Sequence, residues 1–141
     1  MVDYDVKLHL SFIREAVNRS EDSSSNCKKL ALTIFFASSI FSSVGKIPSS
    51  SMIVKAFWAS LLMIIVVLWY FDSEYERKRR LYCRLYDTVR SNQDNSISPY
   101  DMSIEQFNGK VDGVFRIMFS VPTCCIYLLL FSSIYSIKEY L

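Results

Sequence analysis

Residues 56–71 read AFWASLLMIIVVLWYF, and residues 72–90, which follow directly, read DSEYERKRRLYCRLYDTVR. The first stretch has no charge over 16 residues, and as a helix it would cover about 24 Å. It ends in Trp69, Tyr70 and Phe71, and the amphipathic rings of Trp and Tyr suit a bilayer–water interface. The arginines and lysines that come next are typical of the cytoplasmic side. The sequence therefore predicts one long helix that leaves a membrane and continues into the cytosol.

The composition indicates one domain with long uncharged regions. Of the 141 residues, 51% are apolar and 15% aromatic, so the chain is too hydrophobic to be a disordered tail. The net charge of +2 gives no general reason to expect nucleic-acid binding. Lys46 and Lys55 are the only charged residues between positions 30 and 71. We therefore expect an all-α membrane protein.

A second apolar segment precedes the long helix and predicts a hairpin of two membrane spans over residues 30–71. This segment, Leu30–Gly45, is separated from the helix by the short link Lys46–Ser51 (KIPSSS), whose proline blocks a continuous helix. Basic residues lie just before the hairpin at 28–29 and just after it at 77–80. Because such residues favour the cytoplasmic side, both ends of the hairpin, and with them the N-terminus, are predicted to be cytoplasmic.

Residues 1–29 form the predicted N-terminal arm. Apolar residues at positions 6, 10, 13 and 17 fit one helical face, although those at 6, 8, 10 and 12 also alternate as in a strand. We favour an amphipathic helix from about Asp5 to Arg19, lying on the membrane surface or packed on the cytoplasmic helices. The polar run Glu21–Asn26 (EDSSSN) predicts a turn before the first span.

After the long helix, residues 72–102 are predicted to comprise its cytoplasmic part and the loop Ser91–Met102, which is rich in turn-forming residues. The sequence of residues 103–141 predicts an amphipathic helix that continues toward the C-terminus. Ser103 and Gln106 resemble a capping box at its start.

The C-terminal part of this helix contains the uncharged segment Ile117–Ile137, whose 21 residues are enough to span a bilayer. Pro122 is expected to kink or loosen it near its start. We expect a third membrane helix, with a re-entrant or buried helix as the alternative.

Small hydroxyl residues follow one side of the predicted first span. Ser38 and Ser42 lie near one helical face and Ser39 beside it. Small residues let helices approach closely in membranes, and this is the interpretation we favour. The alternative is a hydroxyl-lined pore wall, since hydroxyl groups can replace part of an ion's water shell.

The charged stretch has a basic face and a tyrosine stripe. Basic residues can bind anionic lipid headgroups, or several copies of the face can form an anion site in which arginines grip phosphates and tyrosines stack on bases. The predicted ligand-binding residues are Arg77, Lys78, Arg80 and Arg84, flanked by Arg79. The stripe can pack on a helix of the same chain or of a neighbouring subunit, and its predicted interface residues are Tyr75, Tyr82, Tyr86 and Val89.

Motifs of catalysis are missing from the sequence. It has no Gly-rich phosphate loop, HExxH or GxSxG, and its single histidine, His9, has no cysteine partner with a plausible orienting group. Its four cysteines show no CxxC or other zinc-ligand spacing. We predict no enzyme activity, no metal site and no cofactor.

The order of these parts resembles the SLATT family of small bacterial membrane effectors. An amphipathic N-terminal helix and a two-span hairpin are followed by a charged helix, and residues 71–90 (FDSEYERKRRLYCRLYDTVR) are similar to that family's cytoplasmic helix, with a Tyr-x-x-Leu-like pair at Tyr82 and Leu85. The match covers roughly residues 1–92, and the apolar segment 117–137 departs from a plain two-span pattern.

The resemblance implies a homo-oligomeric pore, with a tetramer as the favoured assembly, in the inner membrane of a bacterium. Such effectors serve anti-phage defence by depolarising the membrane, under control of an oligonucleotide or cyclic nucleotide made by a partner nucleotidyltransferase. In the Hailong-type systems, an oligodeoxyadenylate holds the channel shut. Two alternatives remain open, namely a holin-like phage pore and a non-conducting membrane anchor that binds a partner.

Overall fold

The computed structural model describes residues 5–44, 52–91 and 100–140, with the backbone alone at 41–44, 53, 121–122 and 134–140. The described residues include no strand, so the all-helical prediction is confirmed. The helices, in chain order, are α1 (Val6–Val44), α2 (Met52–Ser91), the 3-10 helix η1 (Glu105–Lys110), α3 (Val114–Met118) and α4 (Val121–Tyr140).

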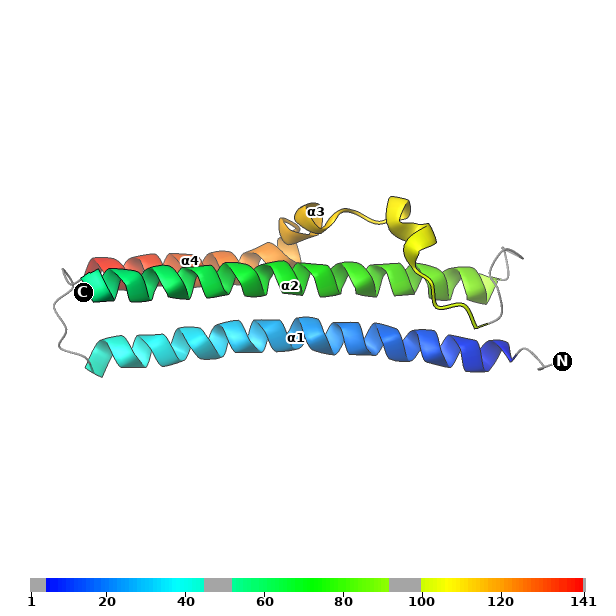
Figure 1. Cartoon of the computed structure of the whole chain (residues 1–141), viewed down its shortest axis with the longest axis horizontal. Helices are drawn as coiled ribbons and strands as arrows, with labels where there is room; N and C mark the ends of the chain where they lie inside the picture. Colours follow the sequence, from blue (N-terminus) through cyan, green and yellow to red (C-terminus); the bar gives the residue numbers. More distant parts are fainter. Residues whose placement is uncertain (1–4, 45–51, 92–99, 141) are drawn as a thin grey trace.

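Helices α1 and α2 form a long antiparallel hairpin (Figure 1). The 40-residue α2 runs unbroken from the apolar stretch into the charged one, which confirms the continuous helix that the sequence predicts. We call Met52–Phe71 its apolar half and Asp72–Ser91 its charged half. Helix α4 lies along the apolar half and also contacts α1, while η1 lies against the charged half.

The predicted turn at Glu21–Asn26 is wrong, because α1 is a single helix of 39 residues that passes through it. The run contains no glycine or proline to stop a helix. Its serines are accommodated inside the helix, where the Ser23 hydroxyl donates to the Arg19 carbonyl at 2.9 Å. Ser24 faces the interior and is 4% exposed. Residues 5–19 and 30–44 are therefore parts of one rod.

The single C-terminal helix predicted from Ser103 onward is also wrong. The Ser103 backbone N–H donates to the Asp101 carboxylate at 2.8 Å, and η1 begins without a side-chain cap, so no capping box forms. Extended backbone at Val111 and Gly113 separates η1 from α3. A further break at 119–120 precedes α4, so Pro122 stands in the first turn of a helix, where its missing N–H is tolerated, instead of kinking one.

Two apolar clusters hold the helices together, one at each half of α2. The first joins all four α-helices through Ala31, Trp58, Leu61, Ile65, Trp69, Met118, Tyr127 and Leu130. The second joins α1, α2 and η1 through Ile13, Leu81, Leu85, Val89 and Phe107. On α2 these residues recur every three or four positions, which is the spacing of one helical face.

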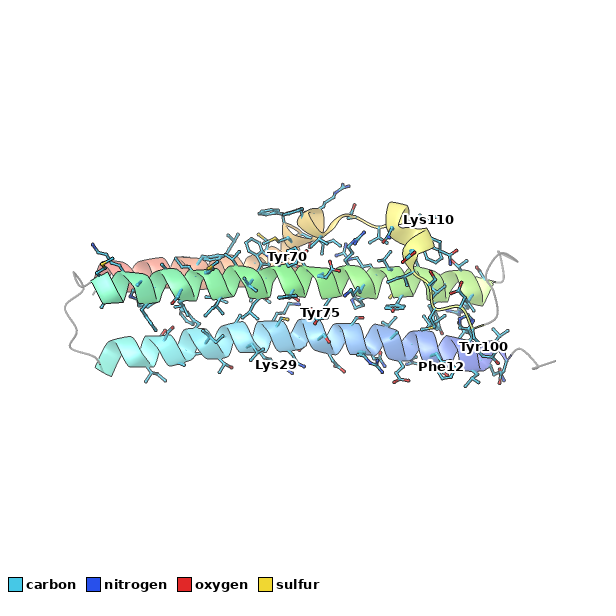
Figure 2. All side chains as sticks on the ribbon, in the orientation of Figure 1. Phe12, Lys29, Tyr70, Tyr75, Tyr100 and Lys110 are labelled. Atoms are coloured by element: carbon cyan, nitrogen blue, oxygen red, sulfur yellow. The ribbon has the colours of Figure 1, made fainter. Side chains whose placement is uncertain are left out.

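The segment before η1 is tied to the N-terminal end of α1, where Figure 2 shows Tyr100 near Phe12. Asp5 caps α1 by accepting from the backbone N–H of Lys7 at 2.9 Å, and the Asp5 N–H donates to the Tyr100 hydroxyl at 3.0 Å. His9, which is fully buried, donates from Nε2 to the Asp101 carbonyl at 3.0 Å. The only histidine of the chain therefore anchors this segment.

The apolar half of α2 leaves one side uncovered. In the part of the chain that the structure describes, α2 is the one helix long and apolar enough to cross a membrane, and 22% of its most apolar window is buried. Large apolar side chains are exposed along it at Met63, Ile64, Val66, Val67, Tyr70 and Phe71. A core helix of a soluble protein would have its apolar side chains covered by other elements.

The second cluster predicts a large difference between two leucine substitutions. Leu85 is fully buried, so Leu85→Ala should lower the free energy of unfolding by about 2–5 kcal/mol, through lost apolar burial and the cavity left behind. Leu8→Ala is the matched control, because Leu8 is 44% exposed, and should change it by no more than about 0.5 kcal/mol. Chemical denaturation measures both, and equal losses would contradict the packing described.

Candidate functional site

A buried carboxylate lies at the junction between the two halves of α2. The interior face of the apolar half is formed by Trp58, Leu61, Ile65 and Trp69, and the next position at this spacing is Asp72, which is fully buried. Its neighbour Ser73 is also fully buried, with its hydroxyl donating to the Trp69 carbonyl at 2.8 Å. A polar layer therefore follows directly on the apolar cluster.

Helix α1 supplies the partners of this carboxylate. The Lys28 ammonium lies 3.3 Å from Asp72 Oδ1, and the Ser24 hydroxyl donates to the same oxygen. Lys28 Nζ also donates to Ser24 Oγ at 3.1 Å, which closes a triangle of three polar groups. Burial of Cys27 in the adjacent turn, together with the negative charge of Asp72, raises the pKa of its thiol, so Cys27 stays protonated at neutral pH.

Helix α4 adds a buried tyrosine beside this layer. The Tyr127 side chain is fully buried and stacks on Trp69, three residues before Asp72 on α2, with ring centroids 5.6 Å apart. Neither Tyr127 Oη nor Asp72 Oδ2 has a hydrogen-bond partner among the described residues. Asp72 thus meets α1 through one oxygen and leaves the other without a partner, and Lys28, Ser24, Asp72 and Tyr127 form what we call the junction cluster.

Sequence reasoning treated Asp72 only as the first residue of the charged stretch and missed this cluster. One signal in the sequence could have found it. The interior-facing residues of the apolar half recur every three or four positions, and the same spacing continued past Trp69 reaches Asp72. The partners could not be found in this way, because Ser24 lies in the segment predicted to be a turn and Lys28 was assigned only to membrane orientation.

The predicted basic face is divided in the structure. Arg80 and Arg84 line a groove of about 350 Å³ between α2 and the segment that follows η1. Arg77 instead points to η1, where its guanidinium donates to Asn108 at 3.3 Å. Lys78 lies over the Tyr75 ring, 5.7 Å from its centroid, and lines a separate groove shared with α1. Two of the four predicted ligand residues therefore share a site.

The groove with Arg80 and Arg84 carries both signs of charge, and Figure 2 shows Lys110 on η1 beside α2. Its lining residues are Arg79, Arg80, Cys83, Arg84, Asp87, Lys110, Val111 and Asp112. Lys110 was missed from the sequence, because only the packing of η1 against α2 brings it there. We call this site the basic groove.

Glu76 orients two of the arginines of the basic groove. Its carboxylate accepts from Arg79 at 2.9 Å and from Arg80 at 3.1 Å. Burial alone would raise the pKa of Glu76, but the hydrogen bonds and positive charges of the two arginines outweigh burial and hold the pKa below its usual 4.5. Arg84 is exposed and has no such ion pair among the described residues, so it is accessible to an anionic ligand.

The tyrosine stripe packs within the chain. Val89 is buried in the second cluster, with Tyr82 and Tyr86 against it, while Tyr75 lines the groove shared with α1. These contacts correspond to the same-chain alternative. The role of the stripe as an interface between subunits stays a prediction.

Of the three predicted pore-lining serines, Ser38 is buried at 5% exposure, and Ser39 is half-buried. Both hydroxyls donate to the Phe35 carbonyl. Ser42 belongs to α1, but its side chain lies outside the described residues. Ser38 and Ala31 are both buried on one face of α1, which favours close helix packing, and a pore-lining role for these serines stays a prediction.

Comparison of the chain with protein-family models, with curated proteins and with solved structures finds no match in any of the three.

The ion pairs of Glu76 predict how stability depends on pH. Because folding lowers the pKa of Glu76, its contribution is present above its usual pKa of 4.5 and is lost as the pH falls through the lower folded value. Glu76→Gln should therefore be less stable than the wild type at neutral pH, and the difference should vanish in acid. Denaturation between about pH 3 and 7 measures it.

The matched control is Glu15→Gln. The Glu15–Arg19 pair has the same sequence spacing as Glu76–Arg80, but both of its side chains are exposed. This pair should therefore contribute little to the free energy of unfolding at any pH. A difference between Glu76→Gln and wild type that stays constant down to low pH would contradict the assignment.

Proposed function

We propose that this chain is a membrane-inserted, homo-oligomeric pore whose opening is controlled by an anionic ligand bound at the basic groove. The nucleotide-controlled effectors of bacterial anti-phage defence, which the sequence resembles, provide the biological setting. In this proposal the hairpin crosses the inner membrane, with the N-terminus and the charged half of α2 in the cytoplasm. A phosphate-rich ligand, such as an oligonucleotide or cyclic nucleotide, is the controlling molecule.

The uncovered apolar side of α2 is the observation that carries this proposal. A run of large apolar side chains, including Ile64, Val67 and Phe71, is exposed along its apolar half. Leaving this area in water is unfavourable by roughly 25 cal/mol for each Å². Lipid or neighbouring subunits would cover it at no such cost, and both are present in an oligomeric membrane protein.

The continuity of α2 supplies the connection between ligand and membrane. Arg80 and Arg84 of the basic groove and the apolar half belong to one helix, with the junction cluster between them. A ligand that binds Arg84 therefore acts on the same rigid element that crosses the bilayer. It would shift the pore between open and closed states only by binding one state more tightly.

A non-conducting membrane anchor is the second candidate, and the burial of Ser38 favours it. In one copy of the chain this serine is turned into the hairpin and hydrogen-bonded to its own helix, which suits a packed interior better than a water-filled wall. The anchor would retain the basic groove as a binding site but would conduct no ions.

Ion flux from liposomes that contain the purified protein tests the proposal. We expect flux that changes when short oligonucleotides or cyclic nucleotides are added. The double variant Arg84→Glu, Lys110→Glu should abolish that change and leave basal flux as in the wild type, because repulsive charges then line the groove. Flux that is unaffected by nucleotides would favour a holin-like pore, and no flux from inserted protein would favour the anchor.

Arg90→Glu is the matched control for this experiment. Arg90 is exposed in the last turn of α2 and does not line the basic groove. It should respond to nucleotides as the wild type does. If Arg90→Glu and the groove variant lose the response equally, net charge and not the groove determines binding.

A further inference from the structure

The short helix α3 is held against the end of the apolar half of α2. The Trp69 indole N–H donates to the Met118 carbonyl at 3.1 Å, and the Trp69 ring contacts Phe119 edge to face at a centroid distance of 5.5 Å. Ile117 and Met118 of α3 are buried. Trp69 therefore fixes both the position of α3 and its level along α2.

Two aromatic rings at α3 are exposed to the outside. Phe115 is 73% exposed, and Phe119, which directly follows α3 and contacts Trp69, is still 67% exposed, although each has an apolar ring large enough to fill a core position. Together with Tyr70 and Phe71, which are also exposed, they form what we call the aromatic collar. The collar lies where the 16 uncharged residues of α2 end.

Charged residues lie next to these aromatic rings on both helices. Arg116, 81% exposed, pairs with Asp112 at 2.9 Å on the surface of α3. Asp72, the first charged residue after the apolar stretch, follows Phe71 on α2. Aromatic rings that border an apolar band, with flexible cationic side chains next to them, are the arrangement found at the headgroup level of bilayers.

We propose that α3 is an interfacial anchor whose Phe115 and Phe119 rings lie at the boundary between lipid headgroups and acyl chains, with Arg116 directed to the lipid phosphates. This inference rests on the membrane insertion proposed above and adds a contact that the spanning helices do not require. The partner is the lipid surface itself. The anchor holds the end of the apolar half of α2, through Trp69, at a fixed depth in the bilayer.

Fluorescence quenching by brominated lipids tests the anchor in the full-length protein. Phe115→Trp places a reporter at the exposed face of α3, where it disturbs no buried contact. In vesicles whose lipids carry bromine near the headgroup end of the acyl chains, the emission that this tryptophan adds to wild type should be largely lost. Phe12→Trp is the matched control, since Phe12 is exposed on α1 far from the collar, and its added emission should persist.

A third reporter separates failure of this inference from failure of the proposed function. Val67 is 46% exposed on the uncovered side of the apolar half of α2, so the emission that Val67→Trp adds to wild type falls in brominated vesicles if that half is inserted. A quenched Trp at position 67 with an unquenched Trp at position 115 would overturn the anchor alone and indicate that protein covers α3. An unquenched Trp at position 67 would overturn insertion, and the anchor with it.

Discussion

A fully buried carboxylate has to be paired, and the pairing of Asp72 constrains how α1 and α2 meet. An unpaired charge at this depth would cost several kcal/mol. Lys28 and Ser24 satisfy one oxygen of Asp72. Sliding α1 by one turn, about 5.4 Å, would take Lys28 away from the carboxylate. The ion pair therefore specifies the register of the hairpin, which the apolar contacts on either side specify less strictly.

Features encoded by local patterns could be predicted from the sequence, and features that depend on distant partners could not. The unbroken α2 follows from its composition, and the short link after α1 predicts an antiparallel hairpin. The segment 21–26 was misjudged because its serines favour turns in isolation, whereas burial of Ser24 against Asp72 keeps them helical. Lys110 reaches the basic groove only because η1 packs against α2, which no periodicity in the sequence indicates.

The junction cluster also separates two surfaces of opposite character on one helix. Before Asp72, α2 exposes apolar side chains, and after it α2 carries the arginines that Glu76 orders. In the proposed function these surfaces bind lipid and an anionic ligand. In the same proposal, a displacement at the basic groove would move the apolar half as part of one continuous helix, and the ion pair of Asp72 with Lys28 would couple α1 to that movement.

The most direct test of this account is a double-mutant cycle between Asp72→Asn and Lys28→Met, read as free energies of unfolding. Each single change should destabilise the protein, and the double variant should lose less than the sum of the two, by about 0.5–3 kcal/mol. The exposed pair Glu15–Arg19, treated in the same way, should show a coupling of no more than about 0.5 kcal/mol. Additive losses at Asp72 and Lys28 would contradict the claim that their ion pair holds the hairpin in register.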